Sequence, residues 1–111
     1  MTVRDVAESL GLTVCAGESA LETEVSGGIV CDLLSVVMSH AAEGALWITV
    51  QTHPNVVAVA QVARLAGIVV AHGFEPECAT LLKAQQEGMP LLTTPESSFV
   101  VAGGLYDLGA R

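Results

Sequence analysis

Apolar residues in the middle of the chain form two patterns, continuous runs and helical spacing. Leu46–Val50 is apolar except for Thr49, and Ile68–Ala71 is apolar throughout, so both segments present apolar side chains in both directions. Strands of this kind are typical of a parallel sheet that is covered on two sides. Between them, the polar stretch Gln51–Asn55 predicts a loop, and Val56–Ala66 carries the helical spacing of a largely buried helix.

The same reasoning extends to both ends of the chain. Further strands are predicted at Leu12–Cys15, Leu21–Val25, Ile29–Cys31 and Pro90–Thr93. Further helices are predicted at Val3–Leu10, Leu33–Ala42 and Pro76–Glu87, and a last one from Thr94-Pro95 onward. Alternating strands and helices predict a three-layer α/β/α fold with a mostly parallel sheet, and no linker divides residues 1–111.

Local signals refine these elements. Thr2 and Asp5 are spaced as a capping box, Gly11 and Gly88 suit helix ends, and Asp32 is expected to be an N-cap. Trp47 is expected in the core. Solvent-facing positions are expected at Val57, Gln61, Arg64, Glu77, Thr80, Lys83 and Gln86, and inward-facing ones at Cys78, Leu81 and Leu82.

Composition narrows the class of protein. Of 111 residues 51% are hydrophobic and 14% charged, which excludes intrinsic disorder, and four basic against twelve acidic residues give a net charge of −8. Nucleic acid and anionic membranes are therefore unexpected partners. No apolar stretch is long enough to span a bilayer, and no secretion signal is visible. Three cysteines without a CxxC pair favour reduced thiols in the cytoplasm.

In parallel sheets, ligands bind beyond the carboxyl ends of the strands, so the loops that follow strands are the candidates. The first is Ser26-Gly27-Gly28, where two interpretations stay open: a phosphate cradle, or a tight bend that needs positive φ. Asp32 has a catalytic or metal-binding alternative to its expected capping role. The second loop is Gln51–Asn55, and the third is Ala71-His72-Gly73.

Gln51, Thr52, His53 and Asn55 form the densest polar patch of the chain. Their loop precedes a buried helix, whose first amides favour an anionic group. Histidine changes charge near neutral pH, so His53 could be a donor, a sensor or a metal ligand. The alternative is that His53 and Asn55 only bind loop backbone and cap the helix.

Other chemistry finds little support. His40, His53, His72, Cys31 and Cys78 lack the spacing of a metal motif, and no nucleophile has a base near it in sequence. Neither GxxxxGK[ST] nor GxGxxG occurs. We therefore expect no metal, no cofactor and no catalytic residue.

Two strings, VSGGIVCDLLS at 25–35 and WITVQTHPNVVAVA at 47–60, followed by Ile68–Val70 and Gly88–Thr94, resemble the DRTGG domain family over nearly the whole chain. The resemblance implies the fold of the N-terminal domain of HPr kinase/phosphatase. It also implies a regulatory, ligand-sensing or assembly role, as in members within phosphate acetyltransferases or beside CBS domain pairs. The naming motif of the family falls on Glu24–Gly28, where this chain lacks the arginine.

Three functions follow as hypotheses. The first is a non-catalytic module that binds a nucleotide or a phosphorylated metabolite and acts through self-association or a partner enzyme. Its predicted ligand site comprises Gly27, Gly28, Asp32, Gln51, Thr52, His53 and Asn55. The second is a structural module that forms a homodimer, because the apolar excess exceeds what one small sheet hides. The third is a phosphotransferase.

Overall fold

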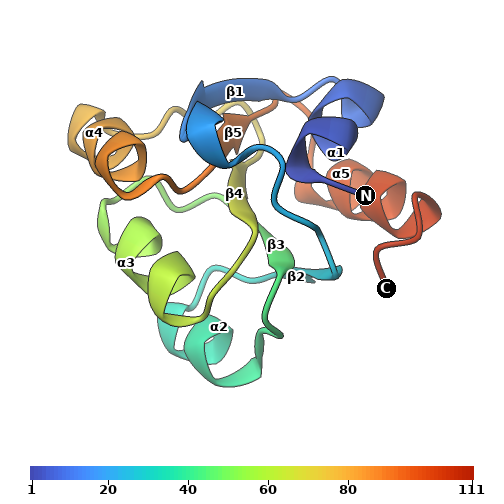
Figure 1. The fold of residues 1–111 in the computed structure, drawn as a ribbon, viewed down its shortest axis with the longest axis horizontal. Helices are drawn as coiled ribbons and strands as arrows, with labels where there is room; N and C mark the ends of the chain where they lie inside the picture. The colour runs from blue at the N-terminus through green and yellow to red at the C-terminus, as the bar shows by residue number, and fades with distance from the viewer.

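The protein, described here by a computed structural model of residues 1–111, is built on one five-stranded sheet (Figure 1). Its strands are β1 (Thr13–Ala16), β2 (Gly27–Val30), β3 (Ala45–Thr49), β4 (Gly67–Val70) and β5 (Leu91–Thr93). The spatial order is β1-β5-β4-β3-β2. The last four strands are mutually parallel, and β1 pairs antiparallel with β5.

Helices cover both faces of the sheet, so the predicted three-layer α/β/α architecture is confirmed. They are α1 (Val3–Leu10), α2 (Leu34–His40), α3 (Asn55–Val62), α4 (Cys78–Glu87) and α5 (Ser98–Asp107), with a short 3₁₀ helix at Glu18–Ala20. The helices α2, α3 and α4 connect successive parallel strands and pack on one face, whereas α1 and α5 pack together on the other (Figure 1). None of the helices is long and apolar enough to cross a membrane.

Each face of the sheet has its own core, because side chains alternate along a strand. Leu46 and Ile48 of β3 face α1 and α5, while Ala45 and Trp47 face α2, α3 and α4. Trp47 is fully buried, as predicted, and its indole N–H donates to the carbonyl of Cys31 at 2.7 Å. Both faces of β3 are therefore occupied, which explains its nearly continuous apolar sequence.

The segment Leu21–Val25 was predicted to be a strand, and the structure does not bear this out. It runs beside the start of α1, where the carbonyls of Leu21 and Thr23 accept from the backbone N–H groups of Arg4 and Val3. The first N–H groups of a helix have no partner within the helix. This segment supplies two of the missing acceptors instead of joining the sheet.

Four helices are shorter than predicted, among them α4, which begins at Cys78 rather than Pro76. α2 begins at Leu34 rather than Leu33 and ends at His40 rather than Ala42. α3 ends at Val62 rather than Ala66, since Arg64 has a φ of 55°, outside the helical region. α5 begins at Ser98, where Ser97 is the N-cap and its hydroxyl accepts from the Val100 N–H, rather than at Thr94-Pro95.

Several predicted helix faces are wrong. Val57, expected toward solvent, is fully buried, and so is Thr80, whose hydroxyl donates to the carbonyl of Thr52 at 2.6 Å. Cys78 and Leu82, expected inward, are exposed. The contact of α4 with the 50–55 loop decides its orientation, and helical spacing alone cannot reveal such a contact.

The predicted capping box of α1 is confirmed. The Thr2 hydroxyl accepts from the Asp5 N–H, and the Asp5 carboxylate accepts from the Thr2 N–H at 2.9 Å. The bond from the Thr2 N–H, and after it the Thr2 hydroxyl, stabilises the charged Asp5 carboxylate and holds the pKa of Asp5 below its ordinary value of 3.8. Gly11 ends the helix in the left-handed region, as predicted.

We expect the Asp5→Asn substitution to lower the free energy of unfolding at pH 7 by an amount that shrinks as the pH falls. A depressed native pKa adds stability above the unfolded value of 3.8, and that stability is lost as the pH falls through the native value. Urea unfolding of both proteins between pH 2 and pH 7 measures the difference. Glu8→Gln on the same helix is the control, and an equal pH dependence in both variants would contradict the assignment.

Candidate functional site

The carboxyl ends of β2, β3, β4 and β5 lie at one edge of the sheet, where the loops after them meet. Asp32, Gln51, Thr52, His53 and Asn55 all belong to this edge. Gly27 and Gly28 do not. They lie at the opposite end of β2, where they pair with Ala45 and Leu46 at the start of β3. The structure therefore brings together five of the seven predicted ligand residues and separates the two glycines from them.

Gly27 and Gly28 are not a bend, contrary to the expectation of positive φ. Both lie inside β2, and neither has a positive φ. A Cβ at Gly28 would lie 2.7 Å from Cδ2 of Leu105 in α5. The glycine at position 28 allows the close approach of a helix to the sheet. Packing, rather than a turn or a phosphate cradle, therefore explains the glycine at this position.

Asp32 does not cap α2, since the N-cap position is Leu33 and no side chain binds there. One carboxylate oxygen of Asp32 accepts from the Thr49 hydroxyl at 2.7 Å and from the Val50 N–H at 2.9 Å. Thr49 is almost completely buried. The Asp32 side chain thus ties the end of β2 to the end of β3.

The neighbouring loop is also ordered by hydrogen bonds to backbone. The Gln51 side-chain amide donates to the Asp32 carbonyl at 3.0 Å, and the Thr52 carbonyl accepts from the Glu77 N–H at 3.2 Å. Nδ1 of His53 accepts from the Asn55 N–H at 3.1 Å, so Nδ1 is unprotonated in this arrangement. Nε2 of His53 and the Asn55 side chain remain at the surface. His53 thus binds loop backbone, as the alternative interpretation anticipated. The Asn55 side chain does not, and the N-cap of α3 is Pro54, which no side chain caps.

Removing the Asp32 carboxylate should destabilise the protein by about 2 kcal/mol, because the buried Thr49 hydroxyl and the Val50 N–H lose their shared acceptor. Asp32→Ala and Thr49→Val, alone and combined, provide a double-mutant cycle in urea unfolding. Strictly additive effects would contradict the coupling of the two side chains.

The molecule has three cavities. None of them is lined by the five predicted ligand residues at the carboxyl edge, Asp32, Gln51, Thr52, His53 and Asn55. Two cavities, of about 250 and about 260 Å³, share Gly28, Ile29 and Arg111 and lie on either side of the edge strand β2. The third, of about 190 Å³, lies at the carboxyl edge beside β4 and β5.

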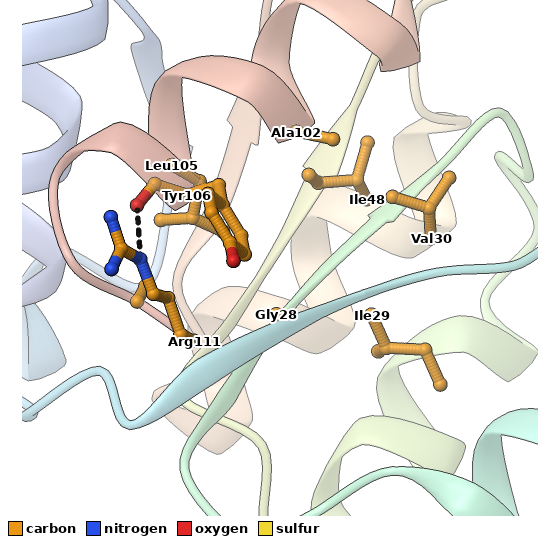
Figure 2. Close-up of a pocket in the computed structure, with 9 residues that line it drawn as sticks. Gly28, Ile29, Val30, Ile48, Ala102, Leu105, Tyr106 and Arg111 are labelled. Carbon is orange, nitrogen blue, oxygen red and sulfur yellow. Dashed lines mark hydrogen bonds between the residues drawn. The ribbon is translucent and has the colours of Figure 1, made fainter.

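The cavity against α5 is mainly apolar. Figure 2 shows Val30 and Ile48 pointing toward the α5 side of β2, where Ala102 and Leu105 close the hollow, while Ile29 points to the opposite face. At its end the Arg111 guanidinium lies 4.5 Å from the centre of the Tyr106 ring. Of the residues that line this cavity, the sequence pointed only to Gly28, although its apolar excess pointed to an uncovered surface.

Chemical groups for metal binding or disulfide formation are dispersed. No three His, Cys, Asp or Glu side chains gather as a possible metal site. Cys15, Cys31 and Cys78 are all free thiols. The cavities and the carboxyl edge offer hydrogen bonding, stacking, apolar contact and, at Arg111 and Glu75, ionic contact.

Comparisons with known proteins bear on both fold and family. A search of curated proteins finds no match. Among solved structures, the chain is similar to the CBS and DRTGG domains of the regulatory region of Clostridium perfringens pyrophosphatase, a structure complexed with the activator diadenosine tetraphosphate. The TM-score is 0.70 at 15% identity, over 94% of this chain and 47% of that one, so this chain spans about half of its neighbour. The sequence model of the DRTGG domain matches residues 5–107, and the chain belongs to the DRTGG domain family.

Proposed function

We propose that this chain is a non-catalytic regulatory module that forms a homodimer through β2 and α5 and responds to a small ligand. The observation that carries the proposal is the uncovered edge strand β2 with an apolar hollow beside it. The outer backbone groups of an edge strand are unpaired, so such a strand can pair with another chain.

Exposed apolar side chains occur on this strand and on α5. Val30 is 53% exposed and Tyr106 57%. Phe99 and Val100, on the first turns of α5, are 86% and 52% exposed. Large exposed apolar side chains that gather on a surface are typical of protein interfaces. We refer to Val30, Phe99, Val100 and Tyr106 as the β2–α5 face.

The charge distribution favours a second copy as the occupant. The chain carries a net charge of −8, yet none of its twelve acidic residues lines either cavity beside β2, and Arg111 lines both. Two copies can therefore meet here without bringing lining carboxylates together. A two-fold axis would place the same face on both protomers.

The ligand part of the proposal draws support from the pyrophosphatase region, whose solved structure holds a nucleotide activator. We propose a nucleotide or phosphorylated metabolite at the carboxyl edge, with Asp32, Gln51, Thr52, His53 and Asn55 as candidate contacts. Support comes from the exposed His53 and Asn55 side chains on a rigid loop. The proposed site does not include Gly27 and Gly28, because they lie at the other end of β2. Ligand binding would change the self-association of the module, and a partner enzyme would respond to that change.

Multi-angle light scattering and sedimentation velocity across micromolar concentrations test the assembly. We expect a mass of twice 11.4 kDa at the upper concentrations. A monomer at every concentration would remove the homodimer. Repeating the measurement with a nucleotide panel, on wild type and His53→Ala, tests whether ligand binding shifts the equilibrium.

A further inference from the structure

The cavity at the carboxyl edge lies between two loops that lead to helices on opposite faces of the sheet. The helix after β4, α4, packs on the same face as α2 and α3, whereas the helix after β5, α5, packs on the opposite face. The loops after β4 and β5 therefore diverge. Open α/β sheets bind ligands in the crevice at such a switch point. The cavity of about 190 Å³ lies there, with Phe74 and Glu75 from one loop and Thr94 from the other.

Hydrogen bonds between the two loops fix the shape of this crevice. The His72 N–H donates to the Glu96 carbonyl at 2.8 Å, and the Gly73 N–H to the Thr94 carbonyl at 3.0 Å. Nε2 of His72 accepts from the Ser98 N–H at 3.1 Å, and His72 has a φ of 63°, unusual for a residue with a side chain. A ligand would thus meet a preformed site and would pay little for ordering it.

The lining selects a class of ligand. Glu75 contributes a carboxylate, and Phe74 offers an aromatic ring that is 53% exposed. Thr13, Thr93 and Thr94 also line the cavity, but the Thr93 hydroxyl already contacts Cys15 Sγ and the Thr94 hydroxyl already accepts from the Glu96 N–H. No lysine or arginine lines the cavity, so a phosphate group would find the Glu75 charge and no cation. A flat, uncharged ring with N–H donors fits all of these groups, because aromatic side chains stack on bases and carboxylates accept from N–H.

We infer that the β4–β5 crevice binds the base of a purine nucleoside or nucleotide, stacked on Phe74, with Glu75 accepting from its N–H groups. Any phosphates point to solvent. The cavity is smaller than a site for a drug-sized molecule, so it holds one ring system rather than a whole dinucleotide. This inference rests on the ligand-sensing part of the proposed function. It names the ligand class and places the base in the crevice, separate from the Gln51–Asn55 loop.

Titration calorimetry with adenosine, guanosine and their 5′-monophosphates tests it on the full chain. We expect Phe74→Ala to weaken binding at least about fivefold, since stacking on an aromatic side chain is lost. Phe74→Trp, which keeps the stacking surface, should retain binding. Leu82→Ala removes an exposed apolar side chain elsewhere, on α4, and should change nothing. Each nucleoside should bind at least as tightly as its monophosphate.

Different outcomes overturn different parts. If Phe74→Ala binds like wild type while His53→Ala weakens binding, the crevice assignment is wrong and ligand sensing stands. The same assignment fails if the monophosphates bind much more tightly than the nucleosides. If no member of the panel binds wild type, the purine site is rejected, while the homodimer is judged separately by light scattering. Circular dichroism and thermal melting of Phe74→Ala verify that the exposed ring is dispensable for folding.

Discussion

A Gly17→Ala variant is expected to lose at least about 3 kcal/mol of its free energy of unfolding, a large share of the roughly 5–15 kcal/mol typical of a domain. Gly17 has a φ of +76°, and a Cβ there would lie 2.2 Å from the carbonyl oxygen of Met89. That neighbour is backbone at the entry to β5, with which β1 pairs, so no side-chain rotation can relieve the clash. Urea unfolding followed by circular dichroism measures the loss.

Gly11→Ala is the matched control. Gly11 has a φ of +66°, but a Cβ there would find nothing within 4 Å. Only the left-handed backbone is then strained, and the expected loss is about 1 kcal/mol. The difference between the two variants isolates the contact with Met89. Equal losses would mean that β1 and β5 separate easily, and the antiparallel edge of the sheet would then contribute little to stability.

The features that could be predicted are those whose cause is local in the sequence. Continuous apolar runs marked β3 and β4, because both faces of these strands are covered. The capping box of Thr2 and Asp5 and the helix-ending Gly88 were also predicted, since each depends on backbone within a few residues. The order of these signals was enough for the three-layer fold.

The wrong predictions have causes that lie far away in the chain. A glycine permits positive φ or close approach, and at Gly28 the deciding neighbour is Leu105 in the last helix. Thr80 looked like a solvent-facing position until its bond to the Thr52 carbonyl was known. The spacing of apolar residues along the sequence cannot reveal such long-range contacts.

The candidate site shows the same division. The polar loop Gln51–Asn55 was visible in the sequence, but its lack of a cavity was not, because cavities form between segments that are distant in sequence. The loop at Ala71–Gly73 was singled out, yet its significance comes from Thr94 on the neighbouring strand. Which loops diverge at the edge of a sheet depends on which face each helix covers.

Val30→Lys is expected to weaken self-association at least about 100-fold, enough to leave monomers at micromolar concentration. In the proposed homodimer Val30 lies on both sides of the two-fold axis, so one substitution places two ammonium groups in an apolar contact. Lysine on an edge strand also opposes pairing with another strand. Because Val30 is 53% exposed, the monomer itself should fold unchanged. Sedimentation velocity with a melting curve for each protein measures both effects.

Val62→Lys makes the same change of charge on α3, which covers the opposite face of the sheet, and Val62 is 68% exposed. It should dimerise like wild type, since a charge of +1 on a chain of −8 has no reason to oppose association in general. Dissociation of both variants would assign the interface to electrostatics of the whole molecule. Dimerisation of both would remove the β2–α5 face from the interface. If Val30→Lys loses dimerisation and Val62→Lys keeps it, the contact lies on β2, the edge strand whose outer side is unpaired.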